Sequence, residues 1–170
     1  ALGLGFATIA VPLALDARWT SAVWAVEGAG VFWMGRRQGR WLARLIGLAL
    51  QVFAAFAYLT GEAWRATSQL PLAHPAFMGA TLLAIAAFVI AWNSRKPPAG
   101  ERNGFDAALV EIETRLSPLA FWISFAWWQF ALNAEIDRRA MDAQGAVNHV
   151  YDHALRVNLE LFGWVASAFI

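Results

Sequence analysis

Apolar residues of this chain gather into long stretches that contain no acidic or basic side chain. Three such stretches are Leu45–Gly61, Ala66–Ser94 and Leu116–Ala134. A helix needs about 20 mostly apolar residues to cross a bilayer. The surface helix of a soluble domain has a charged or polar face, which these stretches lack. The pattern therefore predicts helices whose solvent is lipid.

Three further apolar runs complete the pattern: Ala1–Leu15, Thr20–Gly35, which is broken only by Glu27, and Leu161–Ile170. We therefore predict an all-α fold, a polytopic transmembrane helical bundle that forms a single domain over residues 1–170. Its six membrane segments are expected at about 1–15, 20–35, 41–61, 76–93, 118–134 and 157–170. The first and last are shorter than a full span, so we expect the sequence to be an excerpt of a longer chain.

Two polar segments separate the later spans. Asn103–Leu116 reads as an amphipathic helix, with apolar residues at helical spacing at Phe105, Leu109, Ile112 and Leu116. We expect it to dock on the rest of the protein. Anionic lipid is not an obvious partner, because the polar face of this helix carries three acids, Asp106, Glu111 and Glu113, beside Arg115. Pro118 suits the start of the next span, and Glu135–Arg156 reads as a polar helical stretch.

Composition narrows the class of protein further. Apolar residues make up 59% of the 170 residues, charged residues 15%, and the formal net charge is +1. Disorder is excluded, since it requires low hydrophobicity. The lack of cysteine excludes a disulfide framework, and the small net charge argues against a nucleic-acid partner. Tryptophans stand at predicted span ends, where aromatic belts form, at positions Trp19, Trp41, Trp64 and Trp92.

Basic residues indicate the orientation of the spans. They concentrate in and beside two loops on the same side of the predicted bundle: Arg36, Arg37, Arg40 and Arg44, then Arg95, Lys96, Arg102 and Arg115. Basic residues favour the cytoplasmic side. We therefore expect loops 36–40 and 94–117 in the cytoplasm and Glu135–Arg156 on the outer side.

Glu27 is the sharpest candidate for chemistry, because an ionisable group inside a membrane span is costly unless it has a partner. Its span and the next form a hairpin, and Gln51 lies at a similar depth on the second arm. We predict that Glu27 and Gln51 are neighbours, a membrane-embedded polar pair. The pair could handle protons or substrate. Because Glu27 is a single isolated acid, the favoured interpretation is that its carboxyl group hydrogen-bonds to a neighbouring helix.

Several residues are candidates on the outer face. His149 and His153 lie four residues apart, the spacing of a zinc pair, with Asp152 nearby, but no third ligand is evident. We therefore predict no metal and no cofactor. Asp16, Arg18 and Trp19 form a charged, aromatic turn that could bind a lipid headgroup or a sugar. Such a turn more often anchors a span at the interface.

The runs Ile9–Gly28 and Gly35–Gln51 resemble signature stretches of one family, the large predicted multi-pass bacterial membrane proteins called domain of unknown function 2339. Leu116–Leu119, Trp127–Trp128 and Glu135–Asp137 resemble a later part of the same family. The resemblance implies a multi-pass protein of the bacterial inner (cytoplasmic) membrane with further spans. It implies no activity and no catalytic residue.

Three functions follow as expectations. The first is a scaffold or assembly component of the bacterial envelope. The alternatives are a polytopic envelope enzyme that acts on lipid-linked sugars at the outer face, and a transporter that uses Glu27. Expected partners are the lipid bilayer, the remaining segments of a longer chain, and an envelope glycolipid or another membrane protein.

Overall fold

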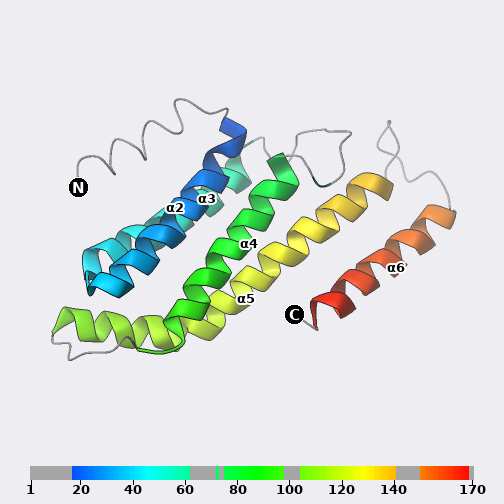
Figure 1. Cartoon of the computed structure of the whole chain (residues 1–170). Coiled ribbons are helices and arrows are strands. Elements are labelled where there is room, and N and C mark those ends of the chain that lie inside the picture. The colour runs from blue at the N-terminus through cyan, green and yellow to red at the C-terminus, as the bar shows by residue number, and fades with distance from the viewer. Residues whose placement is uncertain (1–16, 62–71, 73–74, 98–103, 141–149, 169–170) are drawn as a thin grey trace.

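The computed structural model describes residues 17–61, 72, 75–97, 104–140 and 150–168. These residues form five helices and no strand, which confirms the all-helical prediction. The helices are α2 (Ala17–Gln38), α3 (Trp41–Thr60), α4 (Pro75–Ser94), α5 (Phe105–Ala140) and α6 (Val150–Ser167). Figure 1 shows α2 and α3 as a hairpin, α4 and most of α5 beside it, and α6 beyond α5.

Two of the predicted spans have matching helices that are long and apolar enough to cross a membrane. These are α3 and α4. The segment at 1–15 lies outside the described residues. The segments at 20–35, 118–134 and 157–170 fall mainly within α2, α5 and α6. That these three cross the membrane remains a prediction.

Glycines allow the backbones of α2 and α3 to touch. A Cβ atom added to Gly47 would stand 2.6 Å from the Gly28 carbonyl oxygen and 2.6 Å from the Phe32 nitrogen. The hairpin turn also depends on glycine, since Gly39 has a φ of 66°. The Arg40 N–H then donates to the Gly35 carbonyl at 2.9 Å, which closes the end of α2. Small size and backbone freedom thus define this hairpin.

Helices α4 and α5 are joined by two serines spaced seven residues apart. Ser117 donates to the Ala91 carbonyl at 2.9 Å, and Ser124 donates to the Ala84 carbonyl at 2.8 Å. The same spacing continues along α5 to buried Val110 and Ala131. A seven-residue repeat keeps one seam of α5 facing its neighbour. The seam combines small side chains with hydrogen bonds between helices, as in membrane bundles.

Replacing both serines with alanine should loosen this seam. In a lipid or detergent environment, each interhelical hydrogen bond is expected to contribute about 0.6 to 1.7 kcal/mol to the free energy of unfolding. Reversible unfolding in mixed micelles measures the change. Thr114→Ala is the control, because the Thr114 hydroxyl donates at 2.8 Å to Val110 within its own helix. A loss no larger than that of Thr114→Ala would contradict the prediction.

The bounds of helix α5 differ from those expected from the sequence near Pro118. The amphipathic helix at 103–116 and the span at 118–134 were expected as separate elements, but one helix of 36 residues runs through Pro118. Proline removes one helical hydrogen bond and bends a helix without having to end it. Figure 1 shows the first part of α5 running across the ends of α2 and α3 before the helix turns alongside α4.

The polar stretch 135–156 is likewise divided between two helices. Its beginning is the end of α5 and its final residues begin α6, while 141–149 lie outside the described residues. Glu135 is buried, and one of its carboxylate oxygens accepts the Leu72 N–H at 3.3 Å. This first residue of the stretch therefore contributes to packing.

Candidate functional site

Four charged residues from three helices meet at the end of the bundle where α2 passes into α3. Arg36 Nη1 lies 2.8 Å from Glu113 Oε2, and Arg44 Nε lies 3.1 Å from Glu113 Oε1. Arg44 also pairs with Asp106. We call these residues (Arg36, Arg44, Asp106 and Glu113) the arginine–carboxylate network. Arg36 further donates to the Lys96 carbonyl at 2.6 Å, which ties the chain just after α4 to the same site.

Burial dominates the electrostatics of the network. The Arg44 side chain is 0% exposed and that of Glu113 is 3% exposed. Burial raises the pKa of Glu113 above its ordinary value, while the positive charges of Arg44 and Arg36 oppose that rise. Two guanidinium groups face two carboxylates, so opposite charges balance. Such a cluster joins three helices in one fixed arrangement, because breaking it would leave a buried charge without its counterion.

Local structure explains how these residues come together. Asp106 and Glu113 are seven residues apart, so they share one face of α5. Arg36 and Arg44 stand on opposite arms of the α2–α3 hairpin, close to its turn. Sequence reasoning used the arginines only for orientation and placed the acids on a polar face, so it missed the network. The seven-residue spacing of the acids was the available signal.

The predicted pair in the hairpin lies where α2 and α3 touch. A Cβ atom added to Gly28, the neighbour of Glu27, would stand 3.2 Å from the backbone nitrogen of Gln51. The Gln51 side-chain amide donates to the Leu83 carbonyl of α4 at 3.3 Å. Glu27 is half-buried in α2. Gln51 thus has a partner in a helix that sequence reasoning did not consider, and its pairing with Glu27 stays a prediction.

The outer-face candidates fall largely outside what the structure describes. Asp16 and His149 lie outside the described residues. Arg18, Asp152 and His153 belong to helices, but their side chains also lie outside the description, and Trp19 is half-buried. Within the described ranges, no three histidine or acidic side chains gather as metal ligands would. These candidates stay predictions.

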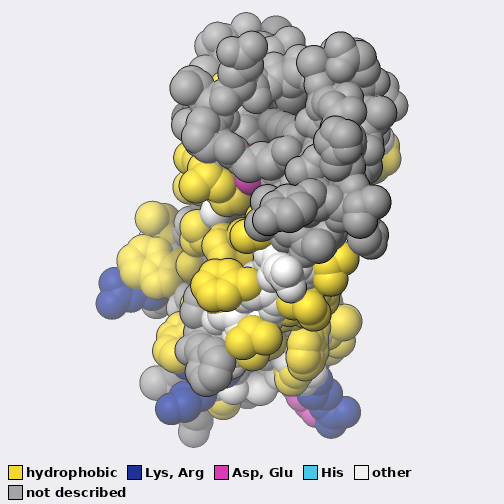
Figure 2. Space-filling view, turned by 90° about the vertical axis from the view of Figure 1, so that its right-hand side faces the viewer, with side chains coloured by type: hydrophobic (Ala, Val, Ile, Leu, Met, Phe, Trp, Pro, Cys, Tyr) yellow, Lys and Arg dark blue, Asp and Glu magenta, His cyan; other side chains and the backbone are white. Residues whose placement is uncertain are grey.

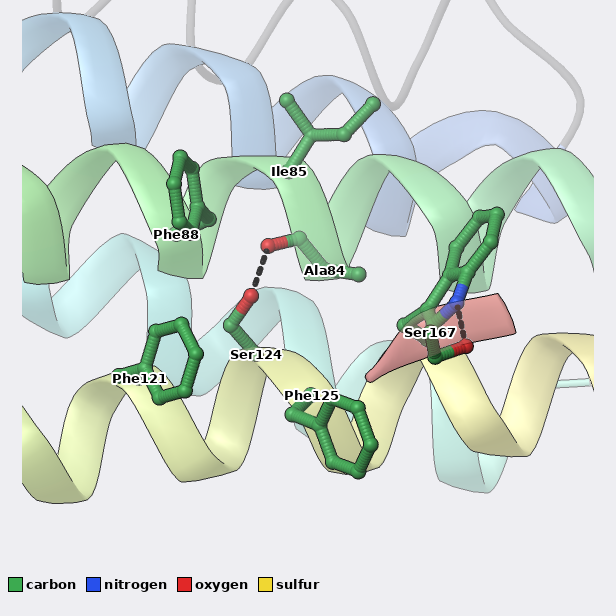
Figure 3. A pocket seen from close by; sticks show the side chains of 8 residues that line it. Ala84, Ile85, Phe88, Phe121, Ser124, Phe125 and Ser167 are labelled. Atoms are coloured by element: carbon green, nitrogen blue, oxygen red, sulfur yellow. Dashed lines mark hydrogen bonds between the residues drawn. The ribbon is translucent and has the colours of Figure 1, made fainter. Parts of the chain in front are cut away.

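A cavity of about 260 Å³ lies between α4, α5 and α6, and Figure 3 shows its lining. Phe88, Phe121 and Phe125 supply aromatic walls. The polar atoms at its edge are engaged by the protein. Ser124 donates to Ala84, and Trp128 Nε1 donates to the Ser167 hydroxyl at 2.8 Å. Ala84 and Ile85 stand at the middle of α4. The cavity therefore suits hydrocarbon rather than a polar substrate.

Comparison with known proteins supports the membrane character that the apolar helices indicate. No curated protein and no solved structure matches the sequence at a significant level. The model of the family described as predicted membrane protein (DUF2339) matches residues 1–169. The match covers nearly the whole chain and includes α3 and α4, the two helices of the described residues that are long and apolar enough to span a membrane. The chain therefore belongs to the DUF2339 family of predicted membrane proteins.

Proposed function

We propose that this protein is an integral protein of the bacterial inner membrane that acts as a scaffold or assembly component of the cell envelope. The observation that carries the proposal is that the ion pairs and hydrogen bonds described between helices join one helix to another. In the described part of the chain, the arginine–carboxylate network joins α2, α3 and α5. The hydrogen bonds that the structure describes between helices end on backbone carbonyls or on side chains of the neighbouring helix.

Further contacts support this view. The Tyr58 hydroxyl donates to the Ala76 carbonyl at 2.8 Å and joins α3 to α4. The two serines of the α4–α5 seam do the same for the next pair of helices. A catalytic site directs polar groups at a bound substrate. Here the described hydrogen bonds between helices hold the bundle together, and the cavity beside them has an apolar lining.

The proposal includes an orientation. Loops 36–40 and 94–117 lie in the cytoplasm, in keeping with the bias of basic residues toward that side. The arginine–carboxylate network then lies at the cytoplasmic end of the bundle.

Deletion of the gene, followed by analysis of envelope polysaccharide and lipid, tests the proposal. We expect a changed envelope that the wild-type gene restores. Glu27→Gln, produced at the normal protein level, should also restore it, as should the control Glu111→Gln, which removes an exposed acid. An unchanged envelope after deletion would contradict the scaffold role. Failure of Glu27→Gln alone would instead favour a transporter that depends on Glu27.

A further inference from the structure

The first part of α5, residues 105–119, has three different sides. The side toward the bundle carries Asp106, Leu109, Val110, Glu113 and Ser117. A second side exposes large apolar side chains: Phe105, Ile112, Leu116 and Leu119. A third side carries the ion pair of Glu111 and Arg115, whose closest atoms are 2.7 Å apart. Since each residue turns the helix by about 100°, the three sets form separate strips along it.

This arrangement reverses the amphipathic pattern of a soluble protein. Two acids point into the protein, while Ile112 is 53% exposed and Leu116 is 50% exposed. An apolar strip beside a polar strip is the pattern of a helix that lies in the plane of a membrane interface. Aromatic side chains accompany it. Trp41 packs edge-on against Phe105 with ring centroids 5.1 Å apart, and tryptophan favours the interface between lipid and water.

The network withdraws two positive and two negative charges from the surface, so an excess of exposed positive charge remains at this end of the bundle. Asp106 and Glu113 are paired with Arg36 and Arg44, so their charges are balanced inside the protein. The exposed basic residues near these helix ends are Arg37, Arg40, Arg95, Lys96 and Arg115. In the described residues of this end, the exposed acid is Glu111. The excess of positive charge therefore faces outward.

Two of these cations lie over tryptophan rings. The guanidinium carbon of Arg37 is 4.9 Å from the centre of the Trp33 ring, and that of Arg95 is 3.1 Å from the centre of the Trp92 ring. Stacking holds each cation beside an aromatic ring of the type that favours membrane interfaces. In Figure 2 the visible Lys and Arg side chains lie toward the lower end of the molecule, below and beside the hydrophobic surface.

We propose that residues 105–119 and the adjoining ends of α2, α3 and α4 form a surface that binds the phosphate groups of anionic phospholipids. The apolar strip enters the boundary of the acyl chains, and the exposed cations contact the headgroups. Basic residues beside a bilayer attract anionic lipid. Two of the three acids that in the sequence argue against such a partner, Asp106 and Glu113, are withdrawn into the network, and the third, Glu111, is paired with Arg115. This surface does not depend on the proposed scaffold role.

Lipid selectivity tests the charge of the surface. The protein is reconstituted in phosphatidylcholine, and the binding of spin-labelled phosphatidylglycerol is compared with that of spin-labelled phosphatidylcholine. We expect a preference for phosphatidylglycerol that falls with salt. A variant that combines Arg37→Gln, Arg95→Gln and Lys96→Gln should lower this preference at least about fivefold, because a single cation near a membrane already contributes about that factor.

Arg156→Gln is the matched control. It removes a cation of α6 that pairs with Glu160 at 2.9 Å, away from the proposed surface, and should leave the preference unchanged. Wild-type protein without a preference for phosphatidylglycerol would overturn the proposal. An equal effect of Arg156→Gln and the triple variant would do the same.

Depth measurements test the apolar strip. The 170-residue sequence has no cysteine, so single cysteines introduced by Ile112→Cys and Glu111→Cys can carry spin labels. We expect the label at 112 to be reached by oxygen, which concentrates in lipid, and the label at 111 by a water-soluble nickel complex. Access of the nickel complex to both positions would contradict membrane contact. Protection of position 112 from both reagents would show that protein covers the strip, and would also overturn the proposal.

Discussion

Replacing Arg44 with methionine is expected to lower the free energy of unfolding by about 3 to 5 kcal/mol, the usual cost of removing one partner from a buried ion pair. Arg44 is fully buried and pairs with both Asp106 and Glu113. Without it, one guanidinium faces two carboxylates inside the protein. Reversible unfolding in mixed micelles, followed by circular dichroism, measures the change. Arg40→Met is the control, because Arg40 is exposed, and it should shift stability by no more than about 0.5 kcal/mol.

The same variant should have a characteristic pH dependence. Burial raises the pKa of Glu113 above its ordinary value of 4.5, and the Coulomb attraction of Arg44 is the largest single influence that opposes this rise. Removing Arg44 therefore raises that pKa further. The folded state then holds the proton more tightly than the unfolded state, so this group's stabilising contribution is present at low pH. It is lost as the pH rises from 4.5 through the raised pKa.

The deficit of Arg44→Met should therefore be smaller in mild acid than at neutral pH. Adding Glu113→Gln to Arg44→Met should abolish most of this pH dependence and recover part of the lost stability, since it removes the carboxylate left without Arg44. A deficit as small as that of Arg40→Met, or equal at both pH values, would contradict this account of the network.

Gly47→Leu is expected to cost at least about 3 kcal/mol, because the added side chain would meet backbone rather than a side chain that can move aside. Its Cβ atom alone would stand 2.6 Å from the Gly28 carbonyl oxygen. The α2–α3 hairpin would have to separate, which would also pull Arg36 away from Arg44. Unfolding in mixed micelles, together with the yield of folded protein, measures the effect.

Gly30→Leu is the matched control for Gly47→Leu. Both are helical glycines of the same hairpin, and both gain about the same helix propensity on substitution. A Cβ atom at Gly30 would meet nothing within 4 Å. We therefore expect Gly30→Leu to be neutral or slightly stabilising. If the two variants behave alike, contact between the backbones of α2 and α3 is not what requires glycine at position 47.

Sequence alone was sufficient where a property depends on consecutive residues. The spans predicted at 41–61 and 76–93 coincide with α3 and α4 to within one residue at each end, because a helix surrounded by lipid needs apolar residues on every side. The family resemblance drawn from Ile9–Gly28 and Gly35–Gln51 also agrees with the family match. Helix boundaries at proline were less predictable. Pro118 was expected to separate two elements, yet hydrogen bonds from Ser117 and Ser124 to α4 hold α5 on both sides of it.

The arrangement of the charges depended on tertiary structure. Sequence spacing placed Asp106 and Glu113 on one face of a helix, but it could not say whether that face meets water or protein. The answer depends on Arg36 and Arg44, more than 60 positions away along the chain, which the hairpin brings to the same end of the bundle. The amino-acid sequence by itself determined that this protein is helical and suited to a membrane. Which of its charges reach the surface was decided only by the packing of α2, α3 and α5, because a buried carboxylate is stable only where the fold supplies its counterion.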